Sequence, residues 1–371
     1  MRGARGFACW IGVGAVVAAV AGSVMASPAG AATFVYVGNA ESNEIYVLQL
    51  DRQNGDLTVI DKTPIPGIEK PGSSTPMSVS PDRHVLYVGT RGEPKVAAGF
   101  AIDHATGKLK FIASGPLADS LAYIATDRSG RFLLGASYPG HRVTVNPIGA
   151  PGKVLPPQQV LENYPNAHSI IADAANRFVL VPTLGNDRIN QFAFDATSGK
   201  LTPTSSPAAE ARPKAGPRHF VYHPGGKLVY VLGELDGNVY VFDYNASSGD
   251  LRQKQVVSAL PAEFQGKPAA ADLHITPNGK FLYGSERTSS TLAGFQVDPV
   301  AGTLTPIGSV PTEKQPRGFG IDPSGHYLLA VGQLSHGLSS YSIDQTSGKL
   351  TKLKEYPMGK NPNWVEILDL P

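Results

Sequence analysis

The segment GPRHFVYHPGGKLVYVLGE, residues 216–234, carries three side chains that could act together on a small anionic molecule. Arg218 and His219 stand where the first of two apolar runs begins, and Glu234 stands where the second run ends. A guanidinium offers forked donors that suit carboxylate, phosphate or carbonyl oxygens. Imidazole and carboxylate groups can accept a proton. If the two runs form a hairpin that turns at residues 223–226, both ends meet and the three side chains gather at one place.

The same hairpin occurs six times, and the positions of Arg218 and Glu234 vary among the copies. Five residues before the turn, three copies have the small residues Thr75, Ala122 and Ala271. At that position the other three copies have His168, Arg218 and Arg317, and eleven residues after the first turn residue three copies have Arg91, Glu234 and Arg287. An unpaired buried charge costs several kcal/mol, so these groups must be solvated, paired or turned toward a ligand. The alternative is that they form ordinary surface ion pairs, and that His219 and His274 are ordinary core or channel histidines.

A second repeat, an apolar strand that leads into a turn ending in Gly-x-Leu, predicts the fold. Its glycines are Gly55, Gly107, Gly199, Gly249, Gly302 and Gly348, with a degraded copy around Gly152. Seven copies spaced by about fifty residues, each with four short strands, indicate an all-β, seven-bladed β-propeller. The segment PNWVEIL near the C-terminus supplies the first strand of a blade whose other three strands lie near the N-terminus, so both chain termini close the last blade. In such a fold the ionisable positions converge at one mouth of the central channel.

The N-terminal residues predict export. Residues 1–32 combine a basic start, an apolar run over residues 8–21 and small residues up to Ala32, which is the pattern of a signal peptide. We expect residues 33–371 to form the propeller and the protein to be periplasmic or secreted, with no membrane span after cleavage; an uncleaved anchor is the alternative. Cys9, the only cysteine, lies within this segment, so the mature chain has no thiol nucleophile, disulfide or cysteine metal ligand.

Charge and motifs exclude several other functions. Cleavage removes two of the 32 basic residues and none of the 30 acidic ones, and equal numbers remain. A neutral chain gives no general attraction to nucleic acid, which we do not expect as a partner. The sequence contains no nucleophile elbow, no His-Glu-x-x-His and no phosphate-binding loop in a strand–loop–helix unit. The predicted axis positions are mainly Arg and His, which repel a cation, so we expect no metal site and no cofactor.

A series of segments resembles the propeller-type 6-phosphogluconolactonases, a family that also includes carboxymuconate cyclases. The similar segments, in order, are SPDRHVLYVGTR, NDRINQF, GPRHFVYHP, ELDGNVYVF, AADLHITPNGKFLYGSERT, QPRGFGIDPSG and GQLSH, and the resemblance covers roughly residues 33–371. It implies a seven-bladed propeller without a metal cofactor and a site that contains His168, Arg218, Glu234 and Arg287. The chain departs from the family at IADAANRF, where Ser-Pro-Asp is usual, and an exported protein would not meet a cytoplasmic phosphosugar lactone.

We therefore predict metal-independent hydrolysis of a lactone at the channel mouth. Glu234 or His168 would act as general base, and Arg218 and Arg287 would stabilise the oxyanion or hold an anionic group. We expect Arg91, His219 and Arg317 to bind the substrate, a small anionic or lactone molecule, and the protein to act as a monomer. The alternatives are a muconate-type lactonising cyclase or isomerase, and a non-catalytic binding propeller of the cell envelope.

Overall fold

A computed structural model describes residue 1, residue 3 and residues 32–371 of the chain. The predicted signal peptide, apart from these two residues and Ala32, lies outside the described residues. Within them, no helix is long and apolar enough to cross a membrane. The described residues contain 29 strands and one short 3-10 helix, Leu184–Asn186, as the prediction of an all-β fold requires.

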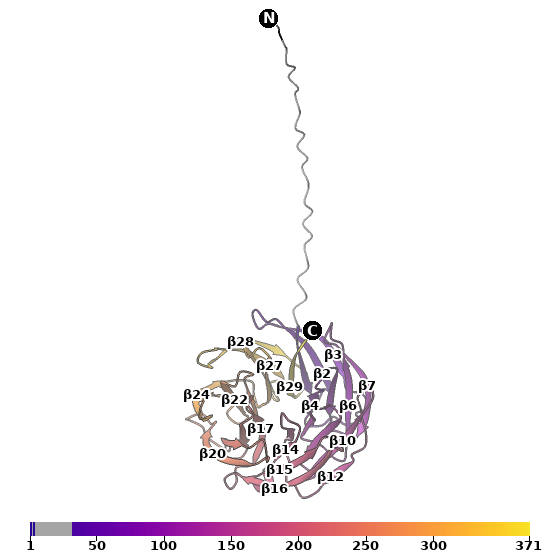
Figure 1. The fold of residues 1–371 in the computed structure, drawn as a ribbon, viewed down its shortest axis with the longest axis vertical. Helices are drawn as coiled ribbons and strands as arrows, with labels where there is room; N and C mark the ends of the chain where they lie inside the picture. The colour runs from indigo at the N-terminus through magenta and orange to yellow at the C-terminus, as the bar shows by residue number, and fades with distance from the viewer. Residues whose placement is uncertain (2, 4–31) are drawn as a thin grey trace. The chain divides into compact units, whose positions relative to one another are not determined.

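The strands form seven antiparallel sheets, which are the blades of a propeller (Figure 1). The first three, in spatial order, are β29 (Pro362–Leu370), β1 (Ala32–Asn39), β2 (Glu44–Leu50) and β3 (Leu57–Pro64); β4 (Met77–Val79), β5 (Val85–Gly89), β6 (Val96–Ile102) and β7 (Leu109–Pro116); and β8 (Tyr123–Thr126), β9 (Phe132–Ser137), β10 (Arg142–Gly149) and β11 (Lys153–Val154), with β12 (Gln159–Leu161) also paired to β10.

The other four blades each consist of consecutive strands. They are β13 (Ile171–Ala172), β14 (Phe178–Thr183), β15 (Arg188–Asp195) and β16 (Lys200–Glu210); β17 (Pro217–Tyr222), β18 (Leu228–Gly233), β19 (Asn238–Tyr244) and β20 (Leu251–Ser258); β21 (Ala270–Ile275), β22 (Phe281–Glu286), β23 (Thr291–Val297) and β24 (Leu304–Pro311); and β25 (Pro316–Ile321), β26 (Tyr327–Gly332), β27 (Gly337–Ile343) and β28 (Leu350–Pro357). In Figure 1, β4, β17 and β29 lie near the centre, and β3, β7, β16, β20, β24 and β28 lie at the rim.

The last blade is closed by both ends of the propeller, as predicted. Strand β29 pairs antiparallel with β1, from Ala32 opposite Leu370 to Tyr36 opposite Glu366. This pairing removes the open edge that β1 would otherwise present to neighbouring chains. It also places Glu366, from the far end of the sequence, on a strand that lines the channel.

The hydrophobic core is divided among the interfaces between blades. Seven buried clusters are present in the described residues, and each one joins two neighbouring blades. A tyrosine in the second strand of a blade can reach the Gly-x-Leu turn of the next blade. The Tyr230 hydroxyl donates to the Gly302 carbonyl at 3.1 Å, and the Tyr283 hydroxyl donates to the Gly348 carbonyl at 2.6 Å. Both glycines have positive φ, near 70°, which a Cβ would strain. The repeated sequence features therefore hold the blades together.

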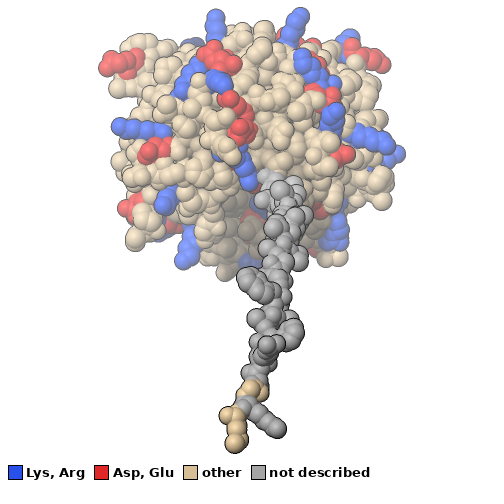
Figure 2. All heavy atoms as spheres, turned by 90° about the horizontal axis from the view of Figure 1, so that it is seen from above, with Lys and Arg blue, Asp and Glu red and all other residues tan. Residues whose placement is uncertain are grey.

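Charged side chains of both signs are interspersed over the face of the molecule seen in Figure 2. The part of this face that the grey atoms leave visible shows no large basic patch of the kind that attracts polyanions. The concentration of positive charge lies elsewhere, in the channel.

Candidate active site

The structure brings all seven predicted site residues to one end of the central channel. Each occupies the start of a first strand or the loop after a second strand, the two places that the hairpin alignment compares. His168 precedes β13, Arg218 and His219 lie in β17, and Arg317 lies in β25, whereas Arg91, Glu234 and Arg287 follow β5, β18 and β22. Five blades thus contribute to one site, and none of them could form it alone.

Glu234 is held between two arginines from neighbouring blades. Its Oε2 lies 2.8 Å from Nε of Arg218, and its Oε1 lies 2.8 Å from Nη2 of Arg287. Burial by itself would raise the pKa of Glu234, but the two guanidinium groups outweigh burial and lower the pKa below its ordinary value. Both oxygens are engaged and the carboxylate is ionised, so Glu234 is poorly suited to accept a proton from water.

Arg218 is the largest side chain that is almost completely buried, with 1 % of it exposed. It donates through Nη1 to the Ala271 carbonyl of the next blade, and its own carbonyl accepts a 2.7 Å hydrogen bond from Ser169. Burial lowers the pKa of Arg218 to about 10, which leaves the group cationic at neutral pH. Arg287 is fixed in a similar way, because its Nε donates to the Ala269 carbonyl at 2.8 Å. The two arginines are therefore preorganised.

Arg91 and Arg317 face the same region without an acidic partner among the described residues. The one polar contact of the Arg91 side chain is at 3.4 Å, from Nε to the Ser120 hydroxyl. Burial lowers the pKa of both groups, and for Arg317 the positive charge of Arg218 lowers it further. Four arginines and one glutamate give the mouth a net positive charge of three. An anionic ligand would relieve this repulsion.

Two neutral histidines lie beside the arginines. The rings of His168 and His219 are 5.3 Å apart, centroid to centroid, and each residue is about 5 % exposed or less. Burial and the charge of Arg218 hold the pKa of His168 well below its ordinary value, and they lower that of His219 to about 4. Nδ1 of His168 and Nε2 of His219 are buried and have no hydrogen-bond partner among the described residues. Both rings are consequently uncharged bases at neutral pH.

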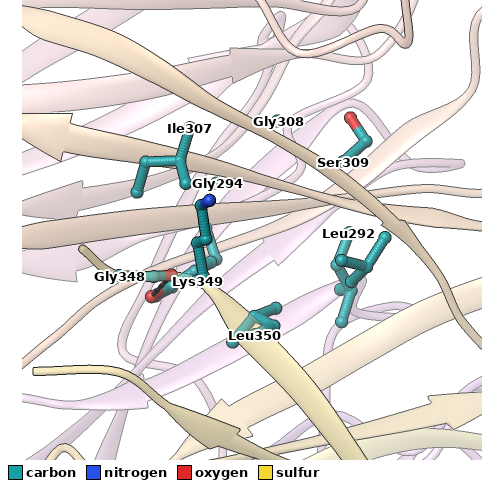
Figure 3. Close-up of a pocket in the computed structure, with 10 residues that line it drawn as sticks. Leu292, Gly294, Ile307, Gly308, Ser309, Gly348, Lys349 and Leu350 are labelled. Carbon is teal, nitrogen blue, oxygen red and sulfur yellow. Dashed lines mark hydrogen bonds between the residues drawn. The ribbon is translucent and has the colours of Figure 1, made fainter.

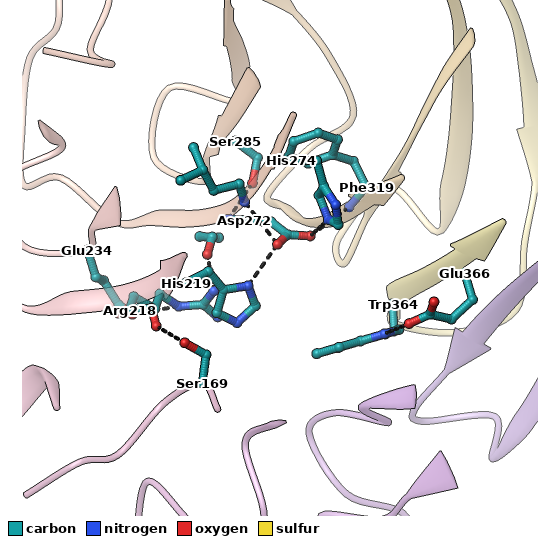
Figure 4. Close-up of polar contacts among 12 residues, drawn as sticks. Ser169, Arg218, His219, Glu234, Asp272, His274, Ser285, Phe319, Trp364 and Glu366 are labelled. Carbon is teal, nitrogen blue, oxygen red and sulfur yellow. Dashed lines mark hydrogen bonds and ion pairs between the residues drawn. The ribbon is translucent and has the colours of Figure 1, made fainter. Parts of the chain in front are cut away.

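The alignment of the six hairpins did not identify Asp272 as a site residue. In the structure its carboxylate binds both His219 and His274 (Figure 4). Its Oδ1 is 2.7 Å from Nδ1 of His219, and its Oδ2 is 3.1 Å from Nε2 of His274. Asp272 occupies the position of His219 in the next hairpin, four residues before the turn. Extending the alignment by one residue beyond Arg218 and Ala271 would have revealed this second pair of ionisable groups.

A cavity of about 190 Å³ lies below His219 inside the channel. Its polar lining comes from His219, Asp272, His274 and Glu366, and Tyr123 and Trp364 supply aromatic walls. The Trp364 indole donates to Glu366 at 2.9 Å, and burial raises the pKa of Glu366 to about 7. His219 therefore separates the arginine-rich mouth from an aromatic and acidic interior.

Another cavity, of about 170 Å³, lies between the β21–β24 and β25–β28 blades (Figure 3). It is lined mainly by glycine and aliphatic side chains such as Leu292, Ile307 and Leu350, with Lys349 at its edge. It has no acid–base pair and no set of convergent donors, so the channel mouth is the better candidate for catalysis. In the described residues, no group of three His, Cys, Asp or Glu side chains is arranged to hold a metal ion.

Comparison with known proteins identifies the family of the chain. Residues 33–367 match the lactonase family described as a seven-bladed β-propeller. The chain is 42 % identical over 288 residues to the 6-phosphogluconolactonase of Pectobacterium carotovorum, and 43 % identical over 288 residues to that of Serratia proteamaculans, covering 78 % of this chain and 84 % of each relative.

A similar solved structure is the periplasmic gluconolactonase of Pseudomonas aeruginosa. It superposes with a TM-score of 0.82 at 27 % identity, covering 92 % of this chain and all of that protein. With the family match and the two relatives, this shows that the chain belongs to the lactonase family of seven-bladed β-propellers.

Proposed function

We propose that this protein is an enzyme that hydrolyses a sugar lactone carrying an anionic group, at the arginine-rich mouth of the channel. One observation carries the proposal: Arg91 and Arg317, which have no acidic partner among residues 32–371, lie beside two neutral histidines. The two arginines would hold the anion, and the histidines would supply a base. The relatives named 6-phosphogluconolactonase support a phosphorylated sugar lactone, and the neighbour named gluconolactonase supports sugar lactones in general.

The chemistry divides among the residues by charge and contact. Arg218 and Arg287, fixed by Glu234, would stabilise the negative charge that develops on the lactone carbonyl oxygen. Removing one such donor typically slows turnover about a hundredfold to a thousandfold. A neutral histidine of the His168 and His219 pair would take the proton from the attacking water. Glu234, with both oxygens engaged, would position the arginines; the sequence-based choice of Glu234 as a possible base is the less favourable one.

The test is proton release by the purified protein, corrected for spontaneous lactone hydrolysis, with EDTA present. The panel contains 6-phosphogluconolactone, gluconolactone and a muconolactone. We expect kcat/KM for the phosphorylated lactone to exceed that for the plain lactone by at least tenfold. Activity that EDTA abolishes, or a reaction of muconolactone without water uptake, would contradict the proposal. Ligand binding without turnover would favour the non-catalytic alternative.

The contribution of Arg317 can be measured separately. A charged hydrogen bond contributes about 1.5 to 3 kcal/mol, so Arg317→Gln should raise KM for the phosphorylated lactone by roughly 10- to 100-fold. It should leave the plain lactone nearly unchanged. Arg188→Gln is the matched control, because Arg188 is half exposed and pairs with Glu210 at 3.3 Å at the edge of another blade. Equal effects of Arg317→Gln on both lactones would remove it from anion binding.

We also propose that the enzyme is exported as a monomer and acts in the periplasm or outside the cell. The basic and apolar pattern of residues 1–32 supports export, as does the similarity to a gluconolactonase described as periplasmic. Closure of the ring by β1 and β29 leaves no blade that needs a second chain. Cell fractionation, the N-terminal sequence of the mature protein and its mass by light scattering test these points. A cytoplasmic protein with an intact Met1 would contradict export.

A further inference from the structure

The carboxylate of Asp272 is saturated by four hydrogen-bond donors. Oδ1 accepts from the Leu273 amide at 2.9 Å and from His219, and Oδ2 accepts from the Phe319 amide at 3.1 Å and from His274. Asp272 itself is 8 % exposed. Burying a carboxylate is costly unless it is paired and hydrogen-bonded, and this one is fixed on both oxygens by donors from three blades. Its orientation is therefore set by the fold.

This arrangement determines which nitrogen of His219 carries the hydrogen. The His274 and His219 rings hold the pKa of Asp272 well below its ordinary value against the effect of burial, so the carboxylate is ionised and only accepts hydrogen bonds. Nδ1 of neutral His219 must then carry the hydrogen, and Nε2 presents a lone pair. That lone pair is buried without a partner among the described residues. A buried acceptor left unpaired is costly, and a hydrogen-bond donor from a ligand or water would remove that cost.

His274 completes the support on the other side of the carboxylate. It packs edge-on against Phe319, with ring centroids 4.8 Å apart, and Asp272 offsets the effect of burial and raises the pKa of His274. Glu366 also faces this part of the cavity. The charge of Asp272 is thus balanced at Oδ2, away from the mouth, while Oδ1 is left to orient His219.

We propose that Asp272 is a positioning residue for lactone hydrolysis, holding His219 in the tautomer and orientation in which Nε2 accepts a proton from the attacking water. The inference rests on the proposed function. It gives His219 the role of general base, beyond the substrate contact predicted from the sequence, and it adds Asp272 to the site.

The proton transfers balance without any further reactant. The water oxygen bonds to the lactone carbonyl carbon while one water proton moves to Nε2 of His219. The ring carbon–oxygen bond then breaks, and the same proton moves from Nε2 to the leaving oxygen, which becomes a hydroxyl group. The new carboxylic acid releases its proton to solvent at neutral pH.

The experiment compares the wild-type protein with Asp272→Asn and with Asp243→Asn as a matched control. Asp243 lies in β19, the third strand of its blade, and pairs with Arg252 at 2.8 Å and Lys254 at 2.6 Å. Loss of the orienting carboxylate in a serine protease lowers kcat about 10⁴-fold through the wrong tautomer. We expect Asp272→Asn to lower kcat by roughly 10²- to 10⁴-fold with KM changed less than threefold, and Asp243→Asn to match the wild type.

Nitrogen-15 NMR of the histidine rings gives a readout that does not depend on turnover. The signals of His219 are assigned by their absence in the His219→Gln variant. In the wild type we expect His219 to carry its hydrogen on Nδ1. In Asp272→Asn we expect His219 to lose this preference for Nδ1. A hydrogen on Nε2 in the wild type would overturn the proposal, as would near-normal kcat in a folded Asp272→Asn protein. If Asp272→Asn fails to fold, the wild-type spectrum still decides. A wild-type protein that hydrolyses no lactone would overturn the proposed function, and this inference with it.

Discussion

The ion pairs of Glu234 allow a quantitative test of whether the channel mouth is built around them. Glu234→Gln keeps the size of the side chain and removes its charge, which leaves Arg218 and Arg287 facing each other. Glu234 faces the two arginines with different oxygens, and in glutamine one of these is replaced by an NH2 group, which donates and so cannot pair with a guanidinium. The exposed fraction of the Glu234 side chain is 19 % and that of Arg218 is 1 %, so water cannot fully replace the lost contacts.

The magnitude follows from the distances. A pair of unit charges 2.8 Å apart attracts by about 6 kcal/mol at an effective dielectric constant of 20, and desolvation offsets part of this. Removing one partner of a buried pair typically costs 3 to 5 kcal/mol. Because Glu234 is partly exposed, we expect a loss near the lower end, about 3 kcal/mol. With an unfolding entropy of about 2.1 cal/mol/K per residue over about 340 residues, the thermal midpoint should fall by about 4 °C.

The assay is thermal unfolding followed by circular dichroism, with and without added phosphate. Phosphate should stabilise Glu234→Gln more than the wild type, because an anion can replace the missing carboxylate between the arginines. The control is Glu210→Gln. The Glu210 side chain is 72 % exposed and pairs with Arg188, so its substitution should change the free energy of unfolding by less than about 0.5 kcal/mol. If Glu234→Gln shifts the midpoint no more than this control, the mouth is not held by these ion pairs.

Three further predictions concern pH, blade packing and closure. The pKa of His219, near 4, and the lowered pKa values of His168 and Glu234 predict that kcat/KM falls only below about pH 5, as the bases are protonated. Glu366 lines the same cavity and has a pKa of about 7, so the test uses Glu366→Gln; an inflection near 6.5 in the pH–rate profile of that variant would show ordinary, solvated histidines instead. Because a bound anion cancels part of the field of Arg218, the inflection in kcat should lie at higher pH than that in kcat/KM. Tyr283→Phe removes the hydrogen bond to Gly348 and should destabilise the protein by about 1 kcal/mol in denaturant unfolding, with kcat unchanged; an equal loss of activity would mean that blade packing reaches the site. Leu370→Ala, at a fully buried position of the closing strand, should cost about 2 to 4 kcal/mol, whereas Leu353→Ala, at an exposed position in β28, should cost little; similar values would deny that closure contributes to stability.

The propeller and its closure were predictable from the sequence because repetition is visible without coordinates. Glycines such as Gly107 and Gly302 must adopt positive φ in every copy of the turn, and apolar strands must recur around them. The location of the site was predictable for the same reason. His168, Arg218 and Arg287 occupy positions where equivalent blades have different side chains, and the ring symmetry places equivalent positions at one mouth.

What only the tertiary structure decided was how these groups are paired and protonated. The sequence could not show that both oxygens of Glu234 are engaged, that Asp272 reaches His219 from the next blade, or that Glu366 on the closing strand faces the same channel. Ion pairs between blades depend on distances across the ring, and pKa values depend on desolvation, which is a property of the packed interior. The sequence by itself therefore determined the repeat, the ring and the residues at its mouth, whereas the pairing and protonation of those residues were set by burial and contact between blades.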